Sequence, residues 1–223
     1  MIRKLRLLLV TGLSLAGLAL LVSLWLQQQA LEQPLKLKAE YLLEVAPGAT
    51  PGGLLNQLED EQILADAFWL RLYWRFNLVE TALHSGEYRL LPGMSALDML
   101  GLWQRAEVVQ HSVAFIEGWS FKQLRAALSN AEKLVQTLDG LSDAQVMQAV
   151  GWPEAHPEGW FFPDTYRYVR GMSDVDLLKQ AAKRQQQVLD EEWQGRAADL
   201  PYNDPYQALI MASLIEKETG VGA

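Results

Sequence analysis

An uncharged apolar segment near the N-terminus constrains this chain most. The twenty residues from Leu7 to Leu26 contain no charged side chain, and about 20 predominantly apolar residues in a helix span the core of a bilayer. Trp25 lies where an interfacial aromatic residue is expected. Three basic residues precede the segment and place the N-terminus in the cytoplasm: Arg3, Lys4 and Arg6. We therefore expect a basic cytoplasmic tail (residues 1–6) and a transmembrane anchor (residues 7–26).

A cleaved signal peptide is the alternative explanation of the same segment. Its apolar core would be shorter, and a small-x-small cleavage site would follow it. Here the sequence after the apolar run is Trp25-Leu26-Gln27-Gln28-Gln29. The sequence therefore favours an uncleaved anchor, with everything after Gln27 outside the cytoplasm.

The exported part of the chain is acidic and has no cysteine. Roughly 195 residues follow the anchor, enough for one large or two small domains with a real core. The net charge of −8 includes basic residues that stay behind the membrane, which argues against nucleic acid as a partner. No disulfide is available. Three isolated histidines and no HExxH motif predict neither a metal site nor a cofactor: His84, His111 and His156.

One pattern recurs three times in the exported part: an extended apolar run, a glycine turn, a hydroxyl residue and a helix. The hydroxyl residues Thr50, Ser95 and Ser120 are placed to cap the helices. The runs are Leu42–Val45, Tyr88–Leu91 and Val113–Ile116. Strand, turn and helix units of this kind predict small α+β modules.

A helix predicted over Ala65–Phe76 lies between the first two strands, with Phe68, Leu72 and Phe76 on one face. The order strand, helix, helix, strand within residues 41–110 resembles the LysM fold of cell-wall-binding modules. Three aromatic residues on this helix form either a sugar-stacking surface or part of the core: Trp69, Tyr73 and Trp74.

A turn-rich aromatic segment, Glu158–Tyr166, follows a short helix predicted over Asp143–Val150 and closed by Gly151. Gly159 and Pro163 prevent a regular helix there, so the sequence predicts three large rings displayed by irregular backbone. Such platforms suit carbohydrate clefts. A loop packed on the core is the alternative.

Two further helices are predicted after this segment. Ser173 opens the first as a capping residue, and Gly195 closes it. Asp204 caps the second, with Pro205 at its first position.

This last helix, Tyr206–Thr219, is almost wholly apolar and carries Glu216 and Glu218 near its end. A carboxylate among apolar residues loses hydration in its charged form, so its pKa rises and it can donate a proton near neutral pH. Such an acid suits glycoside cleavage. The two acids lie about 200° apart on the helix, so only one can point into a given cleft. Periodicity does not choose between them, and both could instead solvate the helix end.

Three parts of the sequence carry a resemblance: the basic and apolar N-terminus, the segment EGWFFPDTY (Glu158–Tyr166) and above all MASLIEKET (Met211–Thr219). Together they resemble the endolytic murein transglycosylase family, also called YceG-like. The resemblance runs from the anchor to the end of the chain. In that family the second acid of the Ile-Glu-Lys-Glu-Thr string is catalytic, which falls on Glu218, and a LysM-like region follows the anchor.

The resemblance implies a bacterial inner-membrane protein, with its N-terminus cytoplasmic and the remainder periplasmic. It would cleave MurNAc–GlcNAc bonds within peptidoglycan glycan strands to give 1,6-anhydro ends. Glu218 would be the proton donor and acceptor, with no metal or cofactor. Cell-wall synthesis proteins are possible partners. The candidate substrate-binding residues are Trp160, Asp164, Tyr166, Ser213 and Glu216.

In one respect the sequence departs from the family. Family members continue well past the catalytic glutamate, so we expect residues 111–223 to be a partial catalytic domain and the chain to be a fragment, with its own activity in question. The expected fold class is α+β: a transmembrane helix, a LysM-like module and the start of a mixed catalytic domain.

Two alternatives from other functional classes remain open. One is a non-catalytic, membrane-tethered wall-binding or scaffold protein. The other is a hydrolase that uses a pair of carboxylates from four candidates: Glu158, Asp164, Glu216 and Glu218.

Overall fold

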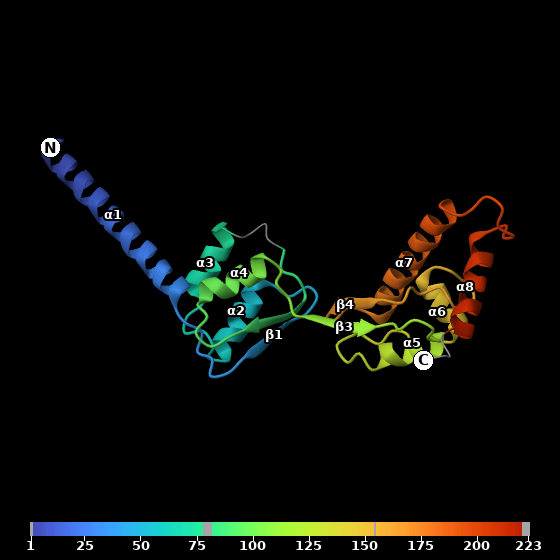
Figure 1. Cartoon of the computed structure of the whole chain (residues 1–223). Helices are drawn as coiled ribbons and strands as arrows, with labels where there is room; N and C mark the ends of the chain where they lie inside the picture. Colours follow the sequence, from blue (N-terminus) through green and yellow to red (C-terminus); the bar gives the residue numbers. More distant parts are fainter. Residues whose placement is uncertain (1, 78–81, 154, 220–223) are drawn as a thin grey trace. The chain divides into compact units, whose positions relative to one another are not determined.

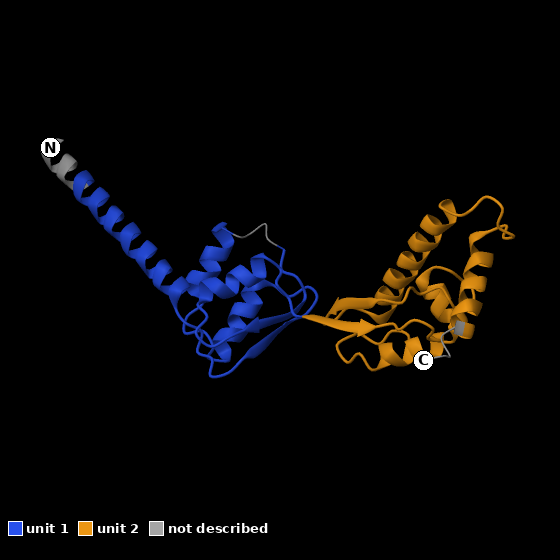
Figure 2. Ribbon diagram, in the orientation of Figure 1, with its two compact units in different colours: residues 1–109 blue, residues 110–223 orange. Residues whose placement is uncertain are grey.

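A computed structural model describes residues 2–77, 82–153 and 155–219, and within these ranges the chain forms eight helices and four strands. The elements fall into two compact units, unit 1 (Met1–Val109) and unit 2 (Gln110–Ala223) (Figures 1 and 2). Each unit combines helices with a two-stranded antiparallel sheet and has its own buried cluster. The mixed α+β class predicted from the sequence is confirmed.

Helix α1, Ile2–Glu32, contains the segment predicted to cross a membrane. Its part from Leu9 to Glu32 is long and apolar enough for a membrane span and is not buried inside the protein. Large side chains along it are exposed, for example Leu13 at 71% and Leu21 at 66%. Water would solvate such a surface poorly. The helix is therefore consistent with a single-pass membrane anchor.

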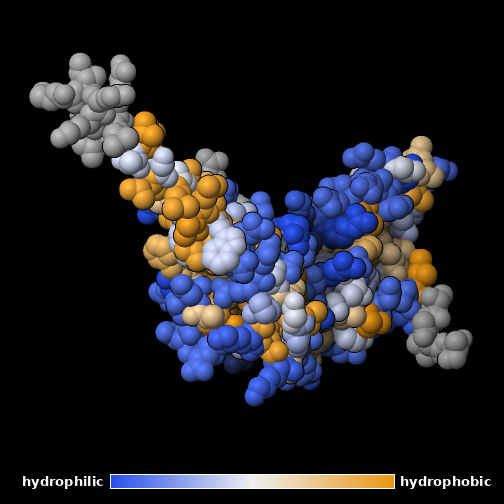
Figure 3. Space-filling model, turned by 90° about the vertical axis from the view of Figure 1, so that its left-hand side faces the viewer, coloured by the Kyte–Doolittle hydropathy of each residue, from blue (hydrophilic) through white to orange (hydrophobic). Residues whose placement is uncertain are grey.

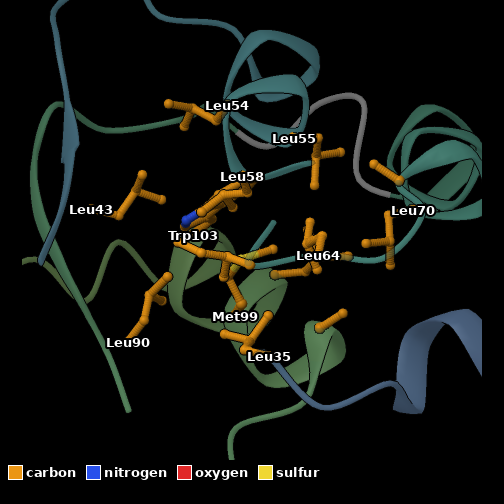
Figure 4. Close-up of a cluster of buried hydrophobic side chains, with 14 of the residues drawn as sticks. Leu35, Leu43, Leu54, Leu55, Leu58, Leu64, Leu70, Leu90, Met99 and Trp103 are labelled. Carbon is orange, nitrogen blue, oxygen red and sulfur yellow. The ribbon is translucent and has the colours of Figure 1, made fainter. Parts of the chain in front are cut away.

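Unit 1 is built around a pair of antiparallel strands, and two helices lie between these strands in the sequence. The elements after α1 are β1 (Tyr41–Val45), α2 (Pro51–Asp60), α3 (Phe68–Asn77), β2 (Gly86–Leu90) and α4 (Ala96–Gln104). Strands β1 and β2 are antiparallel, with Leu43 opposite Tyr88. Both of these side chains are buried, as is Trp103 of α4. Figure 4 shows Leu43 and Trp103 in one core with the leucines of α2 and with Leu70 of α3.

The buried face of α3 is not the one that the sequence analysis singled out. Leu70 and Trp74 are buried, whereas Phe68 is 55% and Phe76 72% exposed. Helix α3 has apolar residues on two opposite faces, and periodicity does not tell which of them meets the core. Trp74 packs edge-on against Trp103 at 5.9 Å between ring centroids, so it belongs to the core and not to a sugar-stacking surface.

Unit 2 pairs its strands across a longer stretch of chain. Its elements are β3 (Gln110–Ala114), α5 (Phe121–Ser129), α6 (Asp143–Val150), β4 (Thr165–Val169), α7 (Asp174–Gln194) and α8 (Pro205–Thr219). Strands β3 and β4 are antiparallel, with Val113 opposite Tyr166. The core joins residues of β4, α5, α6 and α7, including Leu124, Met147 and Leu178.

Local capping signals set most helix ends where the sequence predicts them. Thr50 and Ser95 accept hydrogen bonds from the backbone of the first turns of α2 and α4, and Ser173 caps α7. Helix α6 is closed by Gly151, which follows its last residue and has a left-handed φ of 105°. The third predicted strand is displaced: β3 ends at Ala114, because a turn through Gly118, with a φ of 72°, begins soon after it.

Candidate functional site

Helix α8, which carries both candidate acids, begins where its capping signals predict. The backbone N–H of Gln207 donates to Oδ1 of Asp204 at 2.9 Å. In return, Oε1 of Gln207 accepts from the backbone N–H of Asn203 at 2.9 Å. Pro205 occupies the first helical position, where its missing N–H leaves no hydrogen bond unmade. The start of the helix is thus fixed by its own sequence.

Aromatic stacking holds the N-terminal half of α8 on the body of unit 2. The ring of Tyr206 stacks on Trp160, with centroids 5.5 Å apart and planes 10° from parallel. Trp160 in turn meets the edge of Trp152 at 5.0 Å. One helical turn further along, Leu209 lies against Gly159: a Cβ placed on this glycine would be 3.7 Å from Cδ2 of Leu209. Residues 159–160 therefore form the surface on which the N-terminal half of α8 packs.

A second glycine turn receives the C-terminal half of α8. Nζ of Lys217 donates to the carbonyl oxygen of Gly118 at 3.1 Å. A Cβ placed on Gly118 would lie 3.5 Å from Oε1 of Glu216. Gly118 has a φ of 72°, which residues with a side chain rarely adopt. Glu216 therefore faces the turn between β3 and α5.

Glu218 lies on the other side of the helix, because two residues advance the helix by about 200°. It shares the open face of α8 with three exposed apolar residues: Met211 at 38%, Leu214 at 55% and Ile215 at 55%. Glu216 and Glu218 are themselves exposed. The prediction that apolar neighbours bury the acid is thus wrong for the described residues, because α8 packs through one face only.

The aromatic segment 158–166 packs against the core and does not display three free rings. Phe161 is buried and stacks on Phe121, with centroids 5.3 Å apart. The guanidinium carbon of Arg184 lies 5.5 Å from the ring centroid of Phe162. Trp160 is held between two other aromatic rings. The alternative left open by the sequence, a loop lying on the core, describes this segment.

Two of the candidate substrate-binding residues lie where β4 begins. Tyr166 is buried, donates its O–H to the carbonyl oxygen of Phe162 at 2.7 Å and packs on Phe115. Burial, with the nearby Asp164 carboxylate as a smaller cause, raises the pKa of Tyr166 to about 12. Asp164 is exposed, and its Oδ1 accepts from the backbone N–H of Thr165 at 2.6 Å. These contacts stabilise the β3–β4 pair.

Glu158, one of the four carboxylates in the hydrolase alternative, has a structural contact. Its Oε2 accepts from the backbone N–H of Phe121 at 3.0 Å, at the first residue of α5. A carboxylate there satisfies a free N–H group and complements the helix dipole. Over the described ranges, no group of three or more His, Asp or Glu side chains is placed to hold a metal ion.

Of the predicted site residues, the structure brings Trp160, Ser213 and Glu216 to the packed face of α8. Ser213 lies beside Gly159, and its Oγ donates to the carbonyl oxygen of Leu209 at 2.9 Å. Glu218 lies on the open face. The sequence analysis predicted the glycine turn before Ser120 but not its contact with α8, because Lys217, which meets Gly118, is 99 positions away in the chain.

Comparison with known proteins identifies relatives of this chain. A family model described as the YceG-like family matches residues 43–223. Among solved structures, the crystal structure of a YceG-like protein from Listeria monocytogenes is 21% identical, with a TM-score of 0.36; the match covers 82% of this chain and 66% of that chain. This chain thus spans just under two thirds of the length of that relative. No curated protein matches it.

Proposed function

This chain belongs to the YceG-like family, the endolytic murein transglycosylase family, and from that premise we propose that it is a lytic transglycosylase of peptidoglycan. It would cleave MurNAc–GlcNAc bonds inside glycan strands and leave 1,6-anhydroMurNAc ends. The family match carries this proposal, because it extends over α8 and so includes the Ile-Glu-Lys-Glu-Thr string at Ile215–Thr219.

The chemistry that we propose needs one carboxyl group, that of Glu218. In its protonated form Glu218 donates to the bridging oxygen while the bond from that oxygen to C1 of MurNAc breaks. Positive charge develops on the sugar as an oxocarbenium ion. The carboxylate then accepts the proton of the 6-hydroxyl of the same sugar as its oxygen bonds to C1. The bond broken and the bond formed balance, so no water is consumed and no second acid is required.

The open face of α8 supports this role for Glu218. A sugar ring has apolar faces, which pack well on exposed apolar side chains. Met211 and Leu214, both exposed on the face of Glu218, offer such a surface. A glycan lying there would displace water from the carboxyl group and bring a bridging oxygen within its reach. The desolvation that α8 itself does not provide would then come with the substrate.

Three residues of the packed face are proposed to contribute more indirectly. Glu216 and Ser213 lie along the two glycine turns, and Trp160 anchors the start of the helix. We propose that they fix the orientation of α8 and border the glycan-binding surface. Asp164 stays a candidate as an exposed polar residue, whereas the buried ring and bonded O–H of Tyr166 favour a structural role.

The proposed location is the bacterial inner membrane. Helix α1 would span it once, with the basic residues before Leu7 in the cytoplasm and, in the periplasm, the part of unit 1 that follows α1 and the whole of unit 2. Glycan strands lie in the periplasm, so this orientation gives α8 access to its substrate. Cell-wall synthesis proteins, which work on the same strands, are proposed partners.

Unit 1 is proposed to be a LysM-like wall-binding module. Its order β1, α2, α3, β2 with antiparallel strands agrees with the strand, helix, helix, strand layout of that fold. Helix α4 adds to this layout and supplies Trp103 to the core. Binding of glycan by unit 1 would keep the strand near the membrane for cleavage by unit 2.

Product analysis tests the proposal. The full chain, in lipid nanodiscs, is incubated with purified peptidoglycan, and the new glycan ends are identified by mass spectrometry. We expect anhydro ends, formed about 10²- to 10⁴-fold more slowly by Glu218→Gln, because this is the usual contribution of a general acid. Glu192→Gln, which removes an exposed carboxylate from the end of α7, is the matched control and should retain activity.

The alternatives predict other outcomes of the same assay. Reducing ends in place of anhydro ends would establish a hydrolase. Binding of peptidoglycan without cleavage would favour a tethered wall-binding or scaffold protein.

A further inference from the structure

Helix α3 has a second apolar face, which points away from the core of unit 1. Its inner face, with Leu70 and Trp74, is buried. Phe68, Leu72 and Phe76 follow one another at four-residue spacing on the opposite side, and the two phenylalanines are 55% and 72% exposed. A helix on the surface of a soluble domain presents polar residues on this side. The outer face of α3, defined by these three residues, therefore needs a partner.

The outer face lies next to the proposed membrane anchor. Helix α3 packs against α1, and Figure 1 shows it beside the C-terminal end of that helix, with β1 on the far side of unit 1. In α1 the side chains of Ser23, Gln27 and Leu31 are half-buried at four-residue spacing, whereas the preceding turns from Leu9 are exposed. Helix α3 and its neighbours therefore cover α1 where its apolar run ends.

Apolar surface continues from the anchor to this part of unit 1. Figure 3 shows hydrophobic side chains along α1 down to the body from which the helix projects. The residues around the outer face are also of the kinds found at membrane interfaces. The ring of Trp69 meets that of Phe68 edge-on at 5.2 Å, and Arg75 is an exposed basic residue in the last turn of α3.

We propose that α3 binds the periplasmic surface of the lipid bilayer through its outer face. The inference rests on the proposed anchoring by α1 and adds a second contact with the same membrane. An amphipathic helix in an interface buries its apolar face about 5–10 Å into the boundary between headgroups and acyl chains. Phe68 and Phe76 enter that layer, and Arg75 lies close to anionic headgroups. Unit 1 is then held against the membrane and does not swing freely on α1.

Because the chain contains no cysteine, a single introduced cysteine can be labelled to measure how deeply its position lies in the bilayer. Three single-cysteine variants of the full chain, each labelled with an environment-sensitive fluorophore, are placed in vesicles of phosphatidylethanolamine and phosphatidylglycerol. Phe76→Cys tests the outer face, Leu15→Cys reports on the span, and Leu42→Cys is the control. Leu42 is a matched choice, because it is an apolar side chain 45% exposed on β1.

Quenching by spin-labelled lipids gives the result. We expect the probes at positions 15 and 76 to be quenched several-fold more than the probe at position 42, with the probe at position 76 quenched best by labels near the headgroups. Phe68→Asp, added to the Phe76→Cys variant, should lower quenching at position 76. Thermal unfolding of each labelled variant confirms that unit 1 stays folded, as expected for changes at exposed positions.

Other results overturn the inference in distinguishable ways. If position 15 is quenched and position 76 is no more quenched than position 42, α1 is anchored but α3 does not touch the bilayer. If the probe at position 76 reports an apolar environment without lipid quenching, a second copy or another protein covers the outer face. If position 15 itself is not quenched, the anchoring by α1 fails, and the membrane contact of α3 fails with it.

Discussion

The stack of Trp160 on Tyr206 leads to the prediction that most sharply separates a structural from a substrate-binding role for Trp160. Its ring lies between those of Tyr206 and Trp152, and the stack on Tyr206 is nearly parallel. If this stack holds α8 on unit 2, replacing either partner releases the helix, and replacing both releases it little further. The perturbation is therefore a double-mutant cycle of Trp160→Leu and Tyr206→Leu.

The size of the effect follows from the geometry. An aromatic pair with centroids 4.5–7 Å apart contributes about 0.5–1.5 kcal/mol beyond the area that it buries, and the separation here is 5.5 Å. We expect a coupling energy of about 1 kcal/mol, which corresponds to a change of about fivefold in the equilibrium for local opening of α8.

Native-state hydrogen exchange of the α8 backbone amides measures this opening without unfolding the whole chain. A second cycle, Trp160→Leu with Tyr202→Leu, serves as the control, because Tyr202 precedes the same helix and has no ring contact with Trp160 among the described residues. In this control cycle, the effects of the two substitutions on the opening of α8 should be additive. Equal, near-zero coupling in both cycles would refute the argument and leave the Trp160 ring available for a sugar.

Further predictions concern stability and its pH dependence. In denaturant unfolding, Asp174→Asn should destabilise unit 2 by about 2 kcal/mol or more, because the buried carboxylate accepts from three backbone N–H groups and a threonine hydroxyl. The control is Asp176→Asn at an exposed neighbouring position, which should cost less than about 1 kcal/mol. Gly118→Ala should cost about 1–2 kcal/mol in the same assay, because its φ is left-handed, and an unchanged midpoint would contradict this. Stability should fall between about pH 10 and about pH 12, because unfolded tyrosine loses its proton near 10 whereas the pKa of Tyr166 is about 12. Tyr166→Phe should remove that part of the fall.

Much of the secondary structure could be predicted because its signals are local. A serine before a helix, as at Ser95, or a glycine after it, as at Gly151, acts through hydrogen bonds within one turn, and α4 begins and α6 ends accordingly. The strands β1 and β2 likewise follow from short apolar runs bounded by turns.

Which face of a helix is buried could not be predicted where the helix has apolar residues on more than one face. In α3, Phe68 and Phe76 form as regular a stripe as Leu70 and Trp74, and only the tertiary structure selects the inner one. The same holds for α8, where the sequence left the choice between Glu216 and Glu218 open. Contacts with the glycine turns place Glu216 toward unit 2, and such long-range pairs leave no signal in a single sequence.

The source of the oxygen at the new glycan end tests the central claim most directly. Peptidoglycan is digested in water enriched in heavy oxygen by the unchanged chain and by Glu218→Gln, and the ends are analysed by mass spectrometry. For the unchanged chain we predict ends that lack heavy oxygen and are lighter by one water than hydrolytic ends, because the attacking oxygen is the sugar's own 6-hydroxyl. For Glu218→Gln we predict a large loss of product. Heavy oxygen in the new ends, or an unchanged rate with Glu218→Gln, would contradict a single glutamic acid acting on the substrate's own hydroxyl.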